Sequence, residues 1–542
     1  MSTDRVSTEA RPAAILSSRA ATAWAAFAGV VSAVVVLGVA ELVSLFVGAA
    51  GSPLFAVGSL VIALAPAGVK EFVIAIFGTG DKAALLTLMG VLIVVISGAA
   101  GVLEFRRPPL GVIVIGIGGA VALIAVLTRA GATGFNGIAT IVGGVTGVVV
   151  LRLAIERLGR WQSAAERRAG ADAARRVPGR ALAGPQLERR GFLTLAIVAG
   201  AASVVVGTGA RLVNQGATKV AAIRTKLTLP KPVVPADPVP AGATIDVPGI
   251  SPFVTPNADF YRIDTALQVP SIDPDKWMLK VTGMVENEVS LSFAELLAKP
   301  LEEHHATLTC VSNDVGGDLI GNALWLGYPI RDLLAQAVPK AGADMVLSTS
   351  IDGFTAGTPL SVLQDTGTNA MLAVGMNGTP LPVEHGFPVR MVVPGLYGYV
   401  SATKWVVELK VTKFSEDEGY WTPRGWDAKG PIKLASRIDT PRAGASVAAG
   451  TIAIAGVAWE QHVGVKSVEV QVDDGPWIEA TLADSISADT WRQWVYRWPA
   501  SKGSHKIQVR ATDASGVTQR RTYQPPAPNG SEGWHSISVD VT

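Results

Sequence analysis

The sequence contains one cysteine, Cys310, within the segment TLTCVSNDVGG at residues 307–317. A single thiol excludes an intrachain disulfide, a CxxC zinc site, a CxxCH haem attachment and an all-cysteine iron–sulfur cluster. A lone cysteine is most often a small buried residue, but its thiolate is a soft metal ligand. Cys310 is therefore either part of a core or the one thiolate that this sequence offers to a metal.

A second set of candidate residues follows in MNGTPLPVEHGFPVR at residues 376–390 and SATKW at residues 401–405. Its cations and planar hydrogen-bonding groups are types that bind anionic ligands. The set comprises His385, Arg390, Ser401, Thr403 and Lys404. The alternative for His385 and Arg390 is a structural turn that follows the Asn-Gly pair.

All six histidines lie in the second half of the chain, and His304 and His305 precede Cys310 closely enough to be candidates for proton delivery. An apolar span of the first half cannot supply a histidine pair to a b-type haem. We therefore expect no haem and no iron–sulfur cluster in this chain.

The elements that position these residues differ sharply between the two halves. Of the 542 residues 49% are hydrophobic and only 17% charged, which indicates that much of the chain is not in water. Five apolar runs, rich in Gly and Ala, have the length of membrane spans. They are residues 22–48, 83–104, 109–128, 134–151 and 192–209.

Positive charge predicts the orientation of these spans. Residues 152–190 carry ten arginines against four acids, so this loop is expected to be cytoplasmic, as are the N-terminus and the Arg106-Arg107 pair. These assignments agree only if segment 53–78, which contains Lys70 and Glu71, is re-entrant or interfacial. The chain after about residue 210 then lies outside the cytoplasm, at the plasma membrane of a bacterium.

The last span begins with Glu188-Arg189-Arg190-Gly191-Phe192-Leu193, which resembles a twin-arginine export signal. Such a signal would export the following domain already folded and loaded with a cofactor. The alternative is an ordinary positive flank of a membrane helix.

The sequence predicts four regions: a membrane domain at 1–210, a Pro-rich linker at 211–256, a catalytic domain at 257–425 and a sandwich at 426–542. Prolines favour an extended, semi-rigid spacer that holds the next domain away from the bilayer. Mixed strand and helix patterns indicate an α/β or α+β catalytic domain. Short alternating strands then indicate an immunoglobulin-like β-sandwich.

The cysteine segment and the two downstream segments resemble the sulfite oxidase family of molybdopterin enzymes, from about Asn257 to the end of the sequence. The resemblance includes FYRID at residues 260–264 and a strand with Trp277, Leu279, Val281 and Gly283. The region from 426 is similar to the dimerisation domain of that family, which implies a possible homodimer.

The resemblance implies a molybdopterin cofactor whose molybdenum is bound by Cys310, with Arg262 also catalytic. The implied cofactor-binding residues are Phe260, Tyr261, Arg262, Asp264, Cys310, His385, Arg390, Ser401, Thr403 and Lys404. The chemistry of such a centre is two-electron oxygen-atom transfer to or from a small molecule.

Two departures from the family pattern make sulfite an unsuitable substrate. Asn313-Asp314-Val315 stands where sulfite-oxidising members carry arginines, and Val374 stands where they carry the active-site tyrosine. An acid repels an oxyanion, and valine cannot exchange a proton. A neutral substrate such as a sulfoxide or an N-oxide fits better.

The resulting hypothesis is a membrane-anchored oxidoreductase that exchanges electrons with a separate cytochrome or quinol. The net charge of +2 indicates no nucleic-acid partner. The alternative is a membrane-anchored binding or adhesion module in which the catalytic region is a relic without cofactor. A separate function of the membrane half remains a third hypothesis, carried only by Glu41, Lys70 and Glu71.

Overall fold

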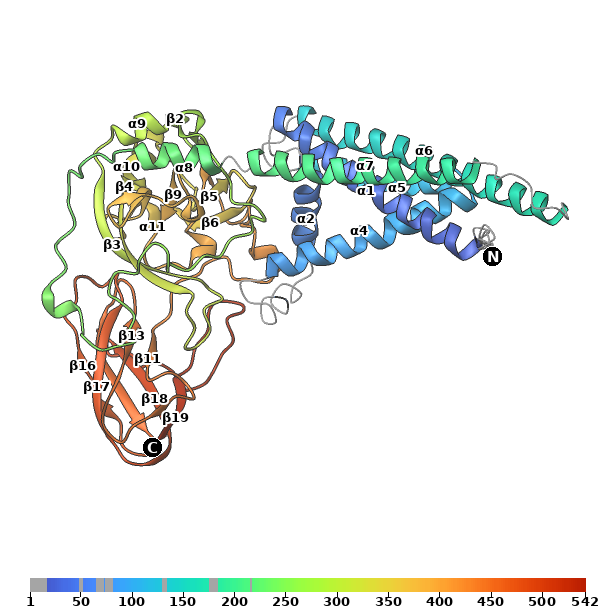
Figure 1. Ribbon diagram of the computed structural model, residues 1–542. Coiled ribbons are helices and arrows are strands. Elements are labelled where there is room, and N and C mark those ends of the chain that lie inside the picture. The colour runs from blue at the N-terminus through green and yellow to red at the C-terminus, as the bar shows by residue number, and fades with distance from the viewer. Residues whose placement is uncertain are drawn as a thin grey trace. The chain divides into compact units, whose positions relative to one another are not determined.

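The computed structural model describes residues 17–47, 52–64, 73, 81–128, 134–174, 184–214 and 217–542. The chain forms two compact units, Met1–Gly216 and Ala217–Thr542, drawn in Figure 1. The first unit is helical, and the second contains a mixed-sheet domain followed by a sandwich of two sheets. The predicted multi-domain fold class is therefore confirmed.

The first unit contains long apolar helices. The described helices of this unit are α1 (Ser18–Val47), α2 (Pro53–Leu64), α4 (Asp81–Arg106), α5 (Leu110–Leu127), α6 (Gly137–Ala174) and α7 (Gly184–Asn214). Five helical segments are long and apolar enough to cross a membrane, and each coincides with one of the predicted spans. They suggest association with a membrane.

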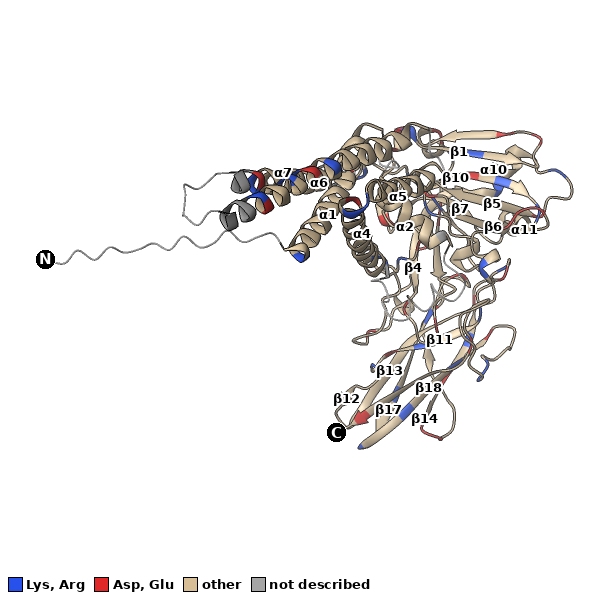
Figure 2. Ribbon diagram, turned by 90° about the vertical axis from the view of Figure 1, so that its right-hand side faces the viewer, with Lys and Arg blue, Asp and Glu red and all other residues tan. Residues whose placement is uncertain are grey.

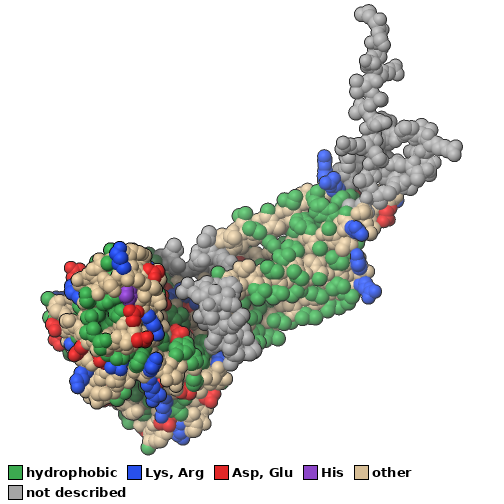
Figure 3. Space-filling view, turned by 90° about the horizontal axis from the view of Figure 1, so that it is seen from below, with side chains coloured by type: hydrophobic (Ala, Val, Ile, Leu, Met, Phe, Trp, Pro, Cys, Tyr) green, Lys and Arg blue, Asp and Glu red, His purple; other side chains and the backbone are tan. Residues whose placement is uncertain are grey.

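The surface of this unit is largely hydrophobic, as Figure 3 shows. Large side chains such as Val95, Ile117 and Val205 are 60–70% exposed. Charged residues gather toward the helix ends, including the ends of α6 and α7 (Figure 2). Such a surface is unstable in water and stable in hydrocarbon.

Small residues bring these helices into close contact. A Cβ atom on Gly29 of α1 would lie 1.9 Å from the backbone oxygen of Ser97 in α4, and one on Gly101 would lie 2.1 Å from that of Ala25. The Ser32 hydroxyl donates to the backbone oxygen of Gly147 in α6 at 2.7 Å. This backbone-to-backbone packing is typical of membrane helices.

Segment 53–78 is described only in part. Its first part is the 12-residue helix α2, which at 1.5 Å per residue spans roughly 18 Å and is too short to cross a bilayer. Lys70 and Glu71 lie outside the described residues. Glu41 is 7% exposed and accepts a hydrogen bond from Ser52 at 2.5 Å.

The Pro-rich segment is extended as predicted, but it is not a free spacer. Helix α8 (Ala217–Lys226) is attached to the catalytic domain by Arg224, whose Nε donates to the Leu381 carbonyl at 2.7 Å. Further along, Val233 N–H donates to the Leu301 carbonyl at 2.8 Å. Backbone groups of the extended segment thus find their hydrogen-bond partners in the domain itself. This corrects the expected role of a spacer.

The catalytic domain is built on two sheets. One has the order β2-β1-β10-β5-β6, in which only β1 and β10 run parallel, and the other has the order β3-β4-β7-β8 with β9 on β7. The strands are β1 (Met278–Gly283), β2 (Val289–Ser292), β3 (Glu302–Thr309), β4 (Ile320–Pro329), β5 (Met345–Ser350), β6 (Thr355–Pro359), β7 (Met371–Met376), β8 (Thr379–Pro380), β9 (Arg390–Val392) and β10 (Val406–Thr412). Three short helices cover them: α9 (Phe293–Leu297), α10 (Ile330–Ala337) and α11 (Leu360–Gln364).

The C-terminal sandwich consists of a sheet of order β11-β13-β17-β16 and a sheet of order β12-β19-β18-β14-β15. The strands are β11 (Ala435–Thr440), β12 (Ser446–Val447), β13 (Gly450–Trp459), β14 (Val465–Val472), β15 (Ile478–Glu479), β16 (Thr481–Leu482), β17 (Arg492–Ala500), β18 (Gly503–Asp513) and β19 (His535–Val541). Alternate residues of both sheets form its core, including Val468, Trp494 and Val509.

Candidate active site

Cys310 follows directly after β3, at the point where the strand pairing with β4 ends. Its backbone N–H donates to the Leu319 carbonyl at 2.9 Å, which closes the loop that follows. The residue is 8% exposed, and burial raises the pKa of its thiol. Hydrogen bonds from Ser312 and the charge of Lys404 act in the opposite direction and favour the thiolate.

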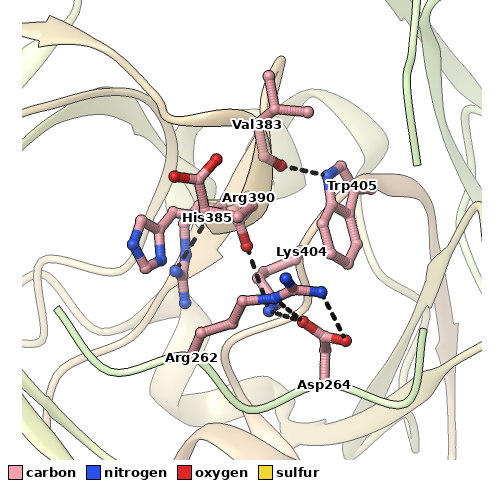
Figure 4. Close-up of polar contacts among 8 residues, drawn as sticks. Arg262, Asp264, Val383, His385, Arg390, Lys404 and Trp405 are labelled. Carbon is pink, nitrogen blue, oxygen red and sulfur yellow. Dashed lines mark hydrogen bonds and ion pairs between the residues drawn. The ribbon is translucent and has the colours of Figure 1, made fainter. Parts of the chain in front are cut away.

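Asp264 collects two cations, as Figure 4 shows. Its Oδ2 lies 2.8 Å from Nε of Arg262 and 2.7 Å from Nζ of Lys404. Burial lowers the pKa of Lys404 to about 8, although Asp264 opposes this shift. The sequence segments around residues 260 and 404 therefore meet at one carboxylate.

Arg390, at the start of β9, is 5% exposed and packs over the ring of Trp325 at 5.1 Å. Its guanidinium donates to the backbone oxygens of Met391 and His385, both at 3.2 Å. Burial lowers its pKa to about 10. Among the residues that the structure describes, Arg390 has no carboxylate partner, so it is a buried cation without a counter-ion.

His385 lies in a tight turn above these cations. Burial and the charges of Arg390 and Lys404 lower the pKa of its imidazole to about 4, so the ring is neutral at physiological pH. Its Nε2 lies 3.2 Å from the Asn257 carbonyl, which assigns the ring proton to Nε2 and leaves Nδ1 as an acceptor. Gly386 has φ +114°, and a Cβ there would lie 2.9 Å from Cβ of Arg390.

The charges of this cluster do not balance. Arg262, Arg390 and Lys404 contribute three cations, and in the described part of the chain Asp264 is the one carboxylate of the cluster and pairs with Arg262 and Lys404. Burying cations without anions is costly, so the arrangement fits an anionic ligand. The phosphate group of a molybdopterin cofactor is such a ligand, and the residues present fit it.

The remaining predicted residues surround this cluster. Phe260 packs edge-on against Trp325 and His385, and Tyr261 stacks on Phe260. The pKa of Tyr261 is raised by burial and by the charge of Cys310. These rings bring the cysteine and the cation cluster into one environment.

Ser401 and Thr403 are fully buried, but their hydroxyls are already engaged. The Ser401 hydroxyl donates to the Tyr397 carbonyl at 3.0 Å, and that of Thr403 lies 2.7 Å from the Ser348 hydroxyl. Their expected contact with a cofactor therefore rests on the backbone rather than on the hydroxyls.

His304 and His305 lie away from the cysteine. They precede Cys310 by six and five residues, which along a strand is roughly 16 to 20 Å. His304 contacts Glu302 at 3.2 Å, and His305 packs against Phe253. The structure does not bring them to the site.

The structure adds residues that the sequence did not indicate. The phenol of Tyr397 is 4% exposed, and its pKa is raised by burial and also by the charges of Glu460 and Cys310. Tyr397 stands in PGLYG at residues 394–398. Glu460 belongs to the sandwich, directly after β13, and no local pattern predicts that its charge acts on a tyrosine of another domain.

Comparisons with known proteins agree with this geometry. Residues 266–421 match the family described as oxidoreductase molybdopterin binding domain, and residues 435–539 match the bacterial Ig domain. The chain is 30% identical over 323 residues to the sulfite oxidase of Gallus gallus, covering 50% of this chain and 69% of the relative. It is 35% identical over 159 residues to an uncharacterized oxidoreductase of Bacillus subtilis, covering 29% of this chain and 76% of the relative.

The mitochondrial sulfite oxidase of Rattus norvegicus is 31% identical over 340 residues, which is 53% of this chain. The chain spans 62% of the length of that relative. These similarities favour an enzyme over a binding module that has lost its cofactor. The chain belongs to the sulfite oxidase family of molybdopterin-dependent oxidoreductases.

Proposed function

We propose that this protein is a membrane-anchored molybdenum enzyme whose catalytic domain lies outside the cytoplasm of a bacterium. The observation that carries the proposal is the cation cluster, in which Arg262 and Lys404 share Asp264 and the buried Arg390 pairs with no carboxylate of the described residues, in the same environment as the single thiol. Cys310 would bind the molybdenum, and the cluster would hold the anionic part of the pterin cofactor.

The residues of the cluster have distinct roles in this proposal. Arg390 and Lys404 neutralise the phosphate of the cofactor, Arg262 orients ligands at the rim, and the neutral His385 accepts a hydrogen bond at Nδ1. When bound, the cofactor supplies two-electron oxygen-atom transfer. Burial around Cys310 excludes bulk water from the thiol.

We propose a neutral substrate, such as a sulfoxide or an N-oxide, in place of sulfite. Val374 is fully buried within β7 and presents no polar group. Asp314 keeps a carboxylate near the cysteine loop, where its Oδ2 accepts a hydrogen bond from the Tyr523 hydroxyl at 3.0 Å. Negative charge at this position disfavours a dianion.

The membrane unit supports the proposed orientation. At one end of this unit, Trp24, Trp161 and Phe192 pack with ring centroids 5.8 to 6.1 Å apart. The arginines of the adjoining segment 152–190 support the assignment of this end to the cytoplasmic side by the positive-inside rule. Electrons would be exchanged with a separate cytochrome or with a quinol in the membrane.

The test uses the full chain, purified in detergent from a cell that makes molybdopterin. Molybdenum is measured by elemental mass spectrometry, and turnover is then measured with a reduced dye plus a sulfoxide or N-oxide, and with sulfite plus an oxidised dye. We expect near-stoichiometric metal and faster turnover of the neutral substrates. Faster turnover of sulfite would overturn the substrate proposal, and metal-free folded protein would overturn the function itself.

A further inference from the structure

Glu460 has an unusual position in the C-terminal sandwich. It follows Trp459, the last residue of β13, in the loop that leads to β14. Its Oε2 atom is buried and has no hydrogen-bond partner among the described residues. A buried carboxylate oxygen without a partner is costly and calls for a functional explanation.

The neighbours of Glu460 fix this loop on the catalytic domain. Nε2 of Gln461 donates to the carbonyl of Thr307 in β3 at 2.5 Å. Nε2 of His462 lies 3.1 Å from the Pro394 carbonyl oxygen. A Cβ on Gly395 would lie 2.4 Å from this Nε2. The loop therefore packs against the segments that carry Cys310 and Tyr397.

Tyr397 connects the two sides. It belongs to the same hydrophobic cluster as Trp459, and its backbone N–H donates to the Gly430 carbonyl at 2.7 Å. Both Cys310 and Glu460 raise the pKa of its phenol, so the phenol lies within the electrostatic reach of both groups. The phenol also has a hydrogen bond with the Lys433 backbone and is affected by the charge of Glu532. The loop that carries Glu460 contacts the segments of both Cys310 and Tyr397.

The pKa values of two carboxyls in the sandwich, Asp513 and Glu460, are shifted in opposite directions. Asp513 accepts hydrogen bonds from the Ser515 hydroxyl and the Val517 N–H, both at 2.8 Å, and these bonds hold its pKa low. Burial, with the charge of Asp513, raises the pKa of Glu460 to about 7. Such a separation marks one group as permanently ionised and the other as able to exchange protons near neutral pH.

We propose that Glu460 is the residue that exchanges protons between the active site and solvent, with Tyr397 between them. The inference rests on the proposed function, because reduction of a sulfoxide consumes two protons and two electrons and yields a sulfide and one water. The electrons come from the reduced cytochrome or quinol. Glu460 gives a proton toward the site and is reprotonated from water.

Among the described residues, Asp513 of β18 is the charge that raises the pKa of Glu460. Glu460 in turn raises the pKa of the Tyr397 phenol, as Glu532 does. His462 pairs with Asp489, and Nδ1 of the histidine lies 2.8 Å from Oδ1 of the aspartate. Protonation of Glu460 is therefore controlled mainly by its burial and by the constant charge of Asp513.

The first experiment compares the pH dependence of turnover in the loaded full chain and three variants. Glu460→Gln removes the titrating group, Glu460→Asp retains an acid, and Glu479→Gln is the matched control at an exposed glutamate of the same domain. We expect Glu460→Gln to lower turnover by about a hundredfold and to abolish the pH dependence near 7. The Asp variant restores part of both, and the control changes neither.

The second experiment needs no turnover. A carboxyl with a raised pKa in the folded state binds more protons than the unfolded chain between about pH 4.5 and 7, so its contribution to stability falls as pH rises across that window. The melting temperature of Glu460→Gln minus that of wild type should therefore increase from pH 5 to pH 8. The same difference for Glu479→Gln should stay constant.

Wild-type turnover and an unchanged pH profile in Glu460→Gln would overturn the proton-exchange role. A constant difference in melting temperature would show that Glu460 does not titrate in this range and would overturn the inference even in an inactive protein. If the protein lacks molybdenum or oxygen-atom transfer while the melting-temperature difference grows, the proposed function fails and the buried titrating acid stands.

Discussion

At the scale of single residues, the site is governed by an excess of buried positive charge. Among the described residues, Arg390 has backbone carbonyls and the ring of Trp325 as its partners, while Lys404 shares Asp264 with Arg262. A protein retains such an arrangement when a ligand supplies the missing anion. The cofactor and the cations are therefore expected to depend on each other.

Replacing Arg390 with Met tests this dependence. Loss of a charge-assisted contact should lower cofactor content at least about tenfold, measured as pterin released on denaturation. The melting temperature of the cofactor-free protein should not fall, because Met fills a similar volume and removes an unpaired buried charge. Arg390→Lys, which keeps a charge, should retain more cofactor.

The control for that experiment is Arg331→Met, which breaks a partly exposed pair with Glu302 outside the site. It should leave cofactor content unchanged. Full cofactor occupancy in Arg390→Met would contradict the assignment of the cation cluster.

Much of the cation cluster could be predicted from sequence, because Arg262, His385, Arg390 and Lys404 stand in recognisable segments. The exact partners could not, since a local pattern does not show that Lys404 and Arg262 share Asp264. Glu460 escaped prediction for the same reason, because it reaches the site only through docking of the sandwich.

At the scale of elements, local signals predicted boundaries best where capping and periodicity agreed. The helical pattern of SFAELL at residues 292–297 forms α9, with Ser292 as its N-cap and a capping box to Glu295. The alternating pattern of VKSVEVQV at residues 465–472 forms β14. The Pro-rich segment was predicted less well, because its partners are far away in the sequence.

The contact between α1 and α4 yields a prediction about the membrane unit. Gly29→Leu should disrupt this contact, because even a Cβ there would collide with the backbone of Ser97. We expect a lower melting temperature of the detergent-solubilised protein and more aggregate in size-exclusion chromatography.

Gly118→Leu is the matched control in α5, because a Cβ there meets nothing within 4 Å. It should behave like wild type. Equal stability of the two variants would show that close packing of α1 on α4 does not hold the unit together.

At the scale of the whole molecule, the net charge is only +2, but positive charge is concentrated in particular segments of the chain. The ten arginines of residues 152–190 are the strongest topological signal, and some of them lie outside the described residues. By the positive-inside rule, these arginines support the proposal that the catalytic unit lies on the opposite side of the membrane.

Changing both Arg189 and Arg190 to Lys distinguishes a twin-arginine export signal from the effect of positive charge alone. Positive charge is preserved, so orientation by the positive-inside rule is unaffected, whereas recognition as a twin-arginine signal is lost. We expect the catalytic domain to become protected from external protease in spheroplasts. The control is the pair Arg157→Lys and Arg160→Lys, which should leave the domain accessible. Unchanged accessibility in the Arg189 and Arg190 variant would contradict export through this signal.

The central claim is that Cys310 binds the molybdenum of a pterin cofactor whose anionic part is bound by the cation cluster. The most direct test is X-ray absorption at the molybdenum edge of the full chain and of its Cys310→Ser variant, both made in a molybdopterin-producing cell. The account predicts metal in the wild type with one more sulfur ligand than in the variant. An identical sulfur shell in both proteins would contradict it.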